Sequence, residues 1–248
     1  MFLAPSRLPM RILALNIRHG GGNRIEAIAR YIGACHPDVV VLSEFRDNAN
    51  ANLLRAHFGR QGLPFFAAAS AVRNQNSVCI ASRIAFIGRA YPQLGPDHCH
   101  RLIAAHFDDL TVYGVYFAQR QAKSTLFDFL LAGPPSADPA ALLVGDFNTG
   151  RHYVDEAAAT FHCARQFELL SRGPYVDCWR SRNPDARQFS WFADSGRGFR
   201  IDHVFATTPI DARVTSIRYD RTPLTQAITD HAALIVECAS ATSRDVPA

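Results

Sequence analysis

The run Leu142-Leu-Val-Gly-Asp-Phe-Asn148 decides how this chain of 248 residues folds, because it is apolar until it ends in polar side chains. Its first three residues are typical of a buried strand, and Gly145 permits a sharp exit from that strand. Side chains two apart on an extended chain point the same way, so we expect Asp146 and Asn148 to face one opening. Such a pair either holds a metal ion, a water or a phosphate, or forms a structural turn.

Four further apolar runs carry polar residues of the same kind at or near an end. These runs are Arg11–Asn16, Asp38–Glu44, Arg200–Phe205 with Asp202 and His203, and Ile228–Val236 with Asp230 and His231. Runs of this kind are typical of strands in the core of a sheet. If their polar ends converge at one edge of the sheets, they form an oxygen-rich cluster with an imidazole. That set of ligands suits Mg²⁺ or Mn²⁺ better than zinc.

In this order the motifs resemble the endonuclease/exonuclease/phosphatase superfamily, over about residues 10–238. The segments Val176–Arg180 and Gln188–Phe192, followed by Arg200-Ile-Asp202, are most similar to the branch of exonuclease III and the apurinic/apyrimidinic endonucleases. The resemblance implies an α/β (α+β) fold of the DNase I-like kind. This is a four-layer sandwich in which two mostly antiparallel β-sheets pack face to face with helices outside. Apolar periodicity also predicts helices over 24–33 and 160–171.

The resemblance implies a metal-assisted hydrolysis in which five of these residues divide the work. Glu44 is the first metal ligand, since a carboxylate at the end of a buried strand rarely has another role. Asn16 and Asp230 complete or orient the metal shell. Asp146 orients or deprotonates the attacking water, and Asn148 holds that water or a phosphate oxygen. We expect Mg²⁺ (or Mn²⁺) as the cofactor.

A single principal ion is favoured over two. Arg18 stands two residues after Asn16, where many apurinic endonucleases have an Asp near the metal. A guanidinium there does not bind a second cation.

A histidine and a tyrosine complete the expected catalytic set. By resemblance His231 lies against the phosphate and Asp202 accepts a hydrogen bond from its other ring nitrogen. His203 points to the opposite face from Asp202 by strand alternation and is left out. Tyr116 corresponds to a tyrosine that relatives place against the scissile phosphate, but Tyr113 competes with it, and core packing explains either tyrosine about as well as catalysis does.

Substrate contacts are expected from polar and aromatic residues in loops around the site. The candidates are Arg73, Asn76, Gln119, Trp191 and Arg200. Trp191 can stack on nucleic acid or simply cover the edge of a sheet, and the cationic residues can contact phosphate without reading sequence.

The composition is compatible with one enzyme domain. Hydrophobic residues make up 48% of the chain and support a sizeable core, with a formal net charge of +4. We expect a flexible N-terminus over 1–9, one domain over 10–239 and a disordered tail over 240–248. The six cysteines form no Cys-X-X-Cys pair, and no run approaches the length of a membrane span, so a cytoplasmic monomer is the default expectation.

The leading hypothesis is a divalent-metal-dependent DNA phosphodiesterase that acts on abasic sites or 3′ ends in DNA repair. A phosphatase or phosphodiesterase for a small molecule, an inositol phosphate or a phospholipid headgroup shares the same catalytic frame and stays open. A non-catalytic binding module is disfavoured because all the core polar positions are present. The mild positive charge permits a polyanionic partner, although an arginine habit of the genome explains most of the arginines as well.

Overall fold

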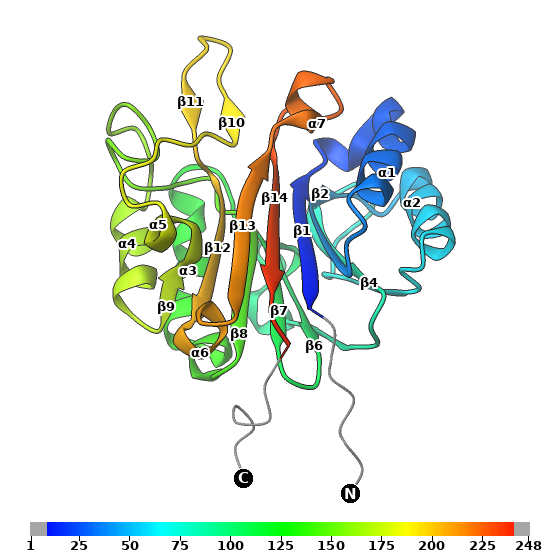
Figure 1. The fold of residues 1–248 in the computed structure, drawn as a ribbon, viewed down its shortest axis with the longest axis horizontal. Helices are drawn as coiled ribbons and strands as arrows, with labels where there is room; N and C mark the ends of the chain where they lie inside the picture. The colour runs from blue at the N-terminus through cyan, green and yellow to red at the C-terminus, as the bar shows by residue number, and fades with distance from the viewer. Residues whose placement is uncertain (1–8, 241–248) are drawn as a thin grey trace, which may run out of the picture.

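Two six-stranded β-sheets pack face to face in the computed structural model, which describes residues 9–240 (Figure 1). The first sheet has the order β13-β14-β1-β2-β4-β3, and the second has the order β5-β6-β7-β8-β12-β9. The strands of the first sheet are β1 (Met10–Asn16), β2 (Val39–Phe45), β3 (Phe65–Ala68), β4 (Ser77–Ser82), β13 (Val214–Asp220) and β14 (Ala233–Cys238). Those of the second are β5 (Ile87–Ala90), β6 (Leu102–His106), β7 (Thr111–Tyr116), β8 (Ala141–Asp146), β9 (Tyr175–Asp177) and β12 (Asp202–Thr207). The expected terminal segments lie outside the described residues, apart from Pro9 and Ser240.

The strand pairs are mostly antiparallel, as the sequence predicts. Two pairs are parallel, β1 with β2 and β7 with β8. Parallel neighbours need a crossover connection. Here α1 (Ile25–Ala34) makes the first crossover and α3 (Ser124–Ala132) makes the second. The carboxyl ends of the two strands in each parallel pair therefore lie at the same edge of their sheet.

Both faces of the central strands are buried, and the alternation of β1 shows how. Ile12 and Ala14 belong to the core between the sheets. Leu13 and Leu15 belong to a second core, beneath α1 and α2 (Ala49–Arg60). A third core lies beneath α3 and α4 (Ala164–Arg172), which cover the outer face of the other sheet (Figure 1). The order helix, sheet, sheet, helix confirms the predicted four-layer sandwich.

Two helices differ in their boundaries from the sequence prediction. The helix expected over 24–33 starts at Ile25 and continues to Ala34. Arg24 instead ends the 3-10 helix η1 (His19–Arg24), in which Gly20, Gly21 and Gly22 have positive φ. The helix expected to start at residue 160 starts only at Ala164, because Cys163 before it has a left-handed φ of 60°. Residues 160–163 therefore lie in the loop before α4 and not in the helix.

The remaining elements are short. They are the 3-10 helices η2 (Pro92–Leu94), η3 (Cys99–Arg101), η4 (Arg120–Lys123) and η5 (Pro134–Ala137), the helices α5 (Cys178–Arg182), α6 (Thr208–Asp211) and α7 (Thr222–Thr225), and the hairpin of β10 (Trp191–Phe192) with β11 (Gly198–Phe199). Of the helices within residues 9–240, none is long and apolar enough to cross a membrane.

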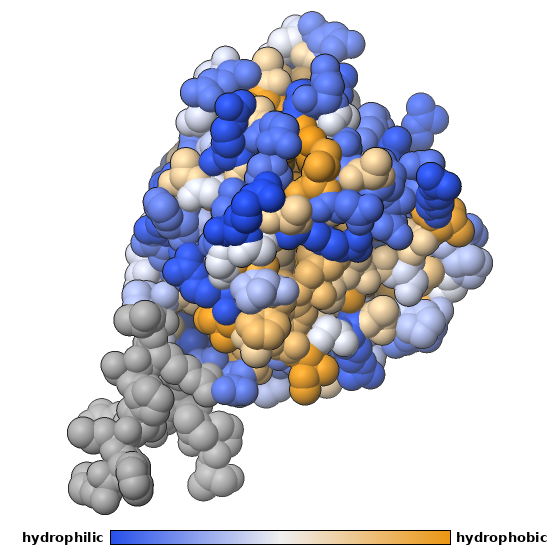
Figure 2. Space-filling model, turned by 90° about the vertical axis from the view of Figure 1, so that its right-hand side faces the viewer, coloured by the Kyte–Doolittle hydropathy of each residue, from blue (hydrophilic) through white to orange (hydrophobic). Residues whose placement is uncertain are grey.

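The surface is polar over much of the face shown in Figure 2, with an apolar area in the lower part of that view. The edge strands contribute exposed apolar side chains, Ile87 on β5 being 75% exposed and Phe65 on β3 40% exposed. Neither residue belongs to the expected site.

The strand ends that carry polar residues meet at one end of the sandwich. β1, β7 and β8 end there at Asn16, Tyr116 and Asp146, and β12 begins there at Asp202. Gly145 is required at this point because its φ is +143° and a Cβ would lie 2.1 Å from the Val115 carbonyl oxygen. The exit from β8 therefore depends on the glycine of the Leu142–Asn148 run.

Candidate active site

Asn16 joins the two sheets at the centre of the site. Its Nδ2 donates to Asp146 Oδ2 at 2.9 Å and to Glu44 Oε1 at 3.2 Å. Its Oδ1 accepts from the Arg18 backbone N–H at 2.9 Å. Asn16 and Asp146 are each only 1% exposed, so this amide fixes the spacing of two carboxylates inside the protein.

Asp146 and Asn148 face the same opening, as the sequence predicts. The Asn148 backbone N–H donates to Asp146 Oδ1 at 2.8 Å, and Asn148 Nδ2 is 3.3 Å from Asp146 Oδ2. Asn148 has a left-handed φ of 52°, and its Nδ2 also donates to the Phe117 carbonyl at 2.9 Å. Burial and the charge of Asp202 raise the pKa of Asp146 to about 7, against the lowering effects of His231, Asn148 and Asn16.

His231 is paired with Asp202 across the site. Its Nδ1 lies 2.8 Å from Asp202 Oδ2, and both side chains are buried. Burial by itself lowers the pKa of His231, but Asp202, Asp146 and Asp230 raise it to about 9. Since Nδ1 donates to the carboxylate, Nε2 is the ring nitrogen available to a ligand in the pocket that His231 lines.

Asp230 and His231 come from a loop, contrary to the expectation that they open a strand. β14 begins only at Ala233, and His231 forms an isolated bridge with Trp191. Asp230 is 3.6 Å from Arg18 Nε, so the two form a partly exposed ion pair.

Glu44 presents its carboxylate to several donors. Oε2 accepts from the His19 backbone N–H at 2.8 Å and from Asn76 Nδ2 at 3.0 Å. The His19 ring nitrogen Nδ1 is also 3.0 Å from Oε2. Asn76, expected among the substrate contacts, therefore lies against the expected metal ligand.

Tyr116, and not Tyr113, faces this cluster. The Tyr116 hydroxyl is 3.4 Å from Asn76 Nδ2, and the Arg101 guanidinium lies 5.2 Å from the centre of the Tyr116 ring. Tyr113 donates instead to Asp138 Oδ2 at 2.9 Å and belongs to the core beneath α3 and α4. The geometry resolves the alternative that the sequence leaves open.

The donor set fits a hard divalent cation. Asn16 bridges the carboxylates of Glu44 and Asp146, and Asp202 is close enough to Asp146 to raise its pKa, so several carboxylate oxygens lie near one another. Within residues 9–240, no group of three or more His, Cys, Asp or Glu side chains is arranged to hold a metal ion by itself. A site with few protein ligands suits Mg²⁺, which keeps several waters and also binds substrate phosphate.

A pocket of about 440 Å³ opens beside this cluster. Its lining includes the polar residues Asp146, Asn148, His231 and Glu44 together with Phe161, Trp191, Phe199 and Ile201. Gln119 also lines it and donates to Asn148 Oδ1 at 2.6 Å. The pocket thus combines groups suited to a phosphate with an aromatic wall.

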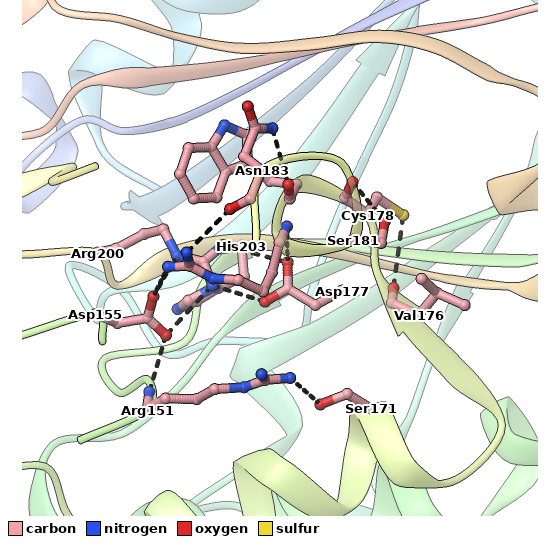
Figure 3. A network of polar contacts seen from close by, with 12 residues as sticks. Arg151, Asp155, Ser171, Val176, Asp177, Cys178, Ser181, Asn183, Arg200 and His203 are labelled. Atoms are coloured by element: carbon pink, nitrogen blue, oxygen red, sulfur yellow. Dashed lines mark hydrogen bonds and ion pairs between the residues drawn. The ribbon is translucent and has the colours of Figure 1, made fainter. Parts of the chain in front are cut away.

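The prediction that Arg200 contacts substrate is wrong. Arg200 is fully buried, and its guanidinium binds Asp155 and Asp177, each at 2.7 Å (Figure 3). Asp155 and Asp177 come from other segments of the chain, and their charges hold the Arg200 side chain inside the protein.

Arg73 is exposed in the loop between β3 and β4 and does not line the pocket. His203 faces away from Asp202, as expected, and its Nε2 donates to the Thr149 carbonyl at 2.8 Å.

Sequence reasoning missed several residues that line the pocket. Lys123 is buried, and its Nζ donates to the Asn148 carbonyl. Burial lowers the pKa of Lys123 to about 8. Its signal in the sequence is that it is the one lysine among many arginines. His19, Phe161 and His162 also line the pocket, and no motif singles them out.

The comparisons with known proteins agree with this architecture. The sequence model of the Endonuclease/Exonuclease/phosphatase family matches residues 13–231. No curated protein matches the sequence. A 3′ phosphatase, NExo from Neisseria, in a complex with a product DNA hairpin is 22% identical, with a TM-score of 0.79 over 92% of this chain and 99% of that one.

Two further solved structures share the fold. The 3′-5′ exonuclease NExo from Neisseria meningitidis is 22% identical, with a TM-score of 0.77 over 93% of this chain and 100% of that one. An AP endonuclease from Archaeoglobus fulgidus is 21% identical, with a TM-score of 0.72 over 92% of this chain and 98% of that one.

Proposed function

Because the chain belongs to the Endonuclease/Exonuclease/phosphatase family, we propose that it is a Mg²⁺-dependent DNA phosphodiesterase that acts at abasic sites or 3′ ends in DNA repair. The observation that carries this proposal is the shared pocket. A buried His231–Asp202 pair and the Asp146–Asn148 pair open into the same cavity as the aromatic wall.

Hydrolysis of a phosphodiester needs an in-line water and neutralisation of charge on the phosphate oxygens. In this proposal Asp146 orients the water and accepts its proton, and His231 Nε2 hydrogen-bonds the phosphate. Asn148 holds Asp146 in position, because its Nδ2 already donates to the Phe117 carbonyl and lies 3.3 Å from Asp146 Oδ2. Glu44, Asn16 and Asp230 would hold the metal ion, which supplies positive charge to the phosphate oxygens and the leaving group when it is bound.

The aromatic wall supports a nucleic acid as the substrate. The Phe161 and Phe199 rings are 5.7 Å apart and the Trp191 and Phe199 rings 5.6 Å apart, so three rings form one continuous surface. Aromatic surfaces beside a phosphate site accept a sugar or a base without reading its identity. The three similar structures carry names of a 3′ phosphatase, a 3′-5′ exonuclease and an AP endonuclease. Those names define the DNA ends that deserve testing.

The test is cleavage of labelled duplexes with an abasic site, a 3′ phosphate or a plain 3′ end, with and without Mg²⁺. D146A and H231A should lose turnover, whereas D128A, on the exposed face of α3, should retain it. Hydrolysis of an inositol polyphosphate or of bis-p-nitrophenyl phosphate without DNA cleavage would retain the site and replace the substrate. Unchanged DNA cleavage by D146A would exclude the proposed mechanism.

A further inference from the structure

One wall of the pocket is a segment without regular secondary structure. This wall segment, residues 149–163, joins Asn148 to α4 and contains neither helix nor strand. Thr160, Phe161 and His162 at its end line the pocket. A long irregular loop keeps one conformation only when its polar groups are satisfied by specific partners.

Asp155 anchors the middle of the wall segment to the scaffold. Its Oδ1 accepts from Arg200 Nε at 2.7 Å and from Arg180 at 2.8 Å, and its Oδ2 accepts from the Arg151 backbone N–H at 2.9 Å (Figure 3). The Arg200 backbone N–H also donates to the Asp155 carbonyl at 2.8 Å. Arg200 lies two residues before Asp202, so this anchor ties the segment to the strand that holds His231 in place.

The next residue, Glu156, organises the end that faces the pocket. Its Oε1 accepts from the backbone N–H groups of Thr160 at 2.7 Å and Phe161 at 3.0 Å, and its Oε2 accepts from the Thr160 hydroxyl. Glu156 is only 2% exposed. Within the described part of the chain, Glu156 also has His152 nearby, whose Nε2 is 4.0 Å from Glu156 Oε1 and donates to the Phe161 carbonyl.

A buried carboxylate costs free energy unless donors replace its water. For Glu156 those donors belong almost entirely to the turn at Thr160 and Phe161, so its burial and the shape of that turn depend on each other. Phe161 in turn packs against Phe199, at 5.7 Å between ring centres. The position of the aromatic wall therefore depends on Glu156. The Glu156 carboxylate acts through the turn at Thr160 and Phe161 and does not itself line the pocket.

We propose that Glu156 is a positioning residue that holds Thr160 and Phe161 in the pocket wall, so that the wall binds the nucleoside attached to the scissile phosphate. This inference rests on the proposed function, since it assumes that the pocket takes a nucleotide. It assigns to Glu156 a role in substrate binding and none in the chemical step, because Glu156 does not line the pocket.

The test compares two p-nitrophenyl phosphodiesters, one carrying thymidine through its 5′ oxygen and one carrying only a methyl group. In E156A, we expect KM for the thymidine ester to rise about tenfold, as the loss of hydrogen bonds to a charged group implies. The rate with the methyl ester should stay within about twofold of wild type, because that ester does not reach the wall. E156Q keeps one carbonyl acceptor and should restore most of the affinity.

Controls separate this role from a structural one. E168Q, on α4, changes the same residue type at a partly exposed ion pair with Arg172. This variant should hydrolyse both esters with the KM and rate of the wild type. T160V removes only the hydroxyl contact and gives a milder variant should E156A fail to fold. In E156A the backbone amides of Thr160 and Phe161 should exchange hydrogen faster than in the wild type. Amides elsewhere in the site should exchange at the wild-type rate.

Each outcome has a meaning. Equal losses with both esters, or no loss with either, would overturn the positioning role. A wild type without preference for the thymidine ester would also overturn it. A clear split between the esters in E156A, together with a wild type that cleaves no DNA, would keep the positioning role and reject only DNA as the substrate. Hydrolysis of neither ester and no cleavage of DNA by the wild type would reject both proposals. If the wild type cleaves DNA but neither ester, an unchanged KM of E156A for the DNA would overturn the positioning role.

Discussion

His231 Nδ1 lies 2.8 Å from Asp202 Oδ2, and this buried contact joins the second sheet to the loop before β14 of the first. The carboxylate fixes which ring nitrogen faces the pocket. The catalytic geometry therefore depends on how the two sheets are packed.

If Asp202 acts through His231, the two residues will not contribute independently. H231A should lower kcat by about 10²–10³-fold, the usual effect of removing one hydrogen-bond donor to the charge of the transition state. D202A should lower kcat less, and the double variant should be no slower than H231A. A double-mutant cycle on DNA cleavage measures this. Losses that multiply would show that Asp202 has a separate role.

The D146N variant should separate activity from stability. Turnover should fall by about 10²–10⁴-fold, because the amide cannot accept a proton from water. Burial beside Asp202 raises the pKa of Asp146 to about 7, so an uncharged amide is less costly to bury. Without divalent ions at pH 8, urea should unfold D146N at a concentration equal to or higher than wild type. A large loss of stability would contradict this.

Mg²⁺ should stabilise the protein through Glu44. A ligand that binds only the folded state raises the melting temperature. We expect Mg²⁺ to raise the melting temperature of the wild type, and this shift to shrink in E44Q. The control is E237Q, at an ion pair with Arg11 at the opposite end of the sandwich. An equal shift in E44Q and the wild type would show that the ion binds elsewhere.

His203 should make the folded state sensitive to acid. Burial, followed by the charge of Arg200, lowers the pKa of His203 to about 4 from an ordinary value of 6.5. Between pH 6.5 and 4 the unfolded chain takes up a proton that the folded protein excludes, so the free energy of unfolding falls as the pH falls. The loss is at most about 3 kcal/mol.

Urea unfolding of wild type and H203Q at several pH values between 7 and 4 provides the measurement. The difference in unfolding free energy between the two proteins isolates His203 from the other titrating groups. As the pH falls, the unfolding free energy of the wild type should decrease more than that of H203Q. A constant difference would show that His203 is not held neutral in the fold.

Arg200 should be important for stability. R200M would leave Asp155 and Asp177 buried without their main counter-charge, so we expect a loss of about 3–5 kcal/mol in the free energy of unfolding. Arg172 pairs with Glu168 at 3.2 Å, but its side chain is 75% exposed. R172M should therefore change the free energy by at most about 0.5 kcal/mol. If chemical denaturation gave R200M and R172M similar losses of unfolding free energy, the buried network of Figure 3 would not stabilise the protein as we expect.

The sequence by itself determined the main strands and which polar residues stand at or near their ends. Apolar runs with buried faces specify β1, β2, β8 and β12, since side-chain alternation follows directly from the extended backbone. Gly145 marked the exit from β8, and its φ of +143° explains why a glycine stands there. That these polar residues meet at one end of the sandwich follows from the order and direction of the strands, which belong to the tertiary structure.

Only the tertiary structure decided the direction and partners of the long side chains. Arg200 looks like a substrate contact in the sequence, yet it points inward to Asp155 and Asp177. Asn76 reaches Glu44, and Tyr116 faces the pocket while Tyr113 does not. Local periodicity specifies the face of a strand, but the position of a guanidinium or an amide depends on charges and hydrogen-bond partners that the fold brings together from distant segments.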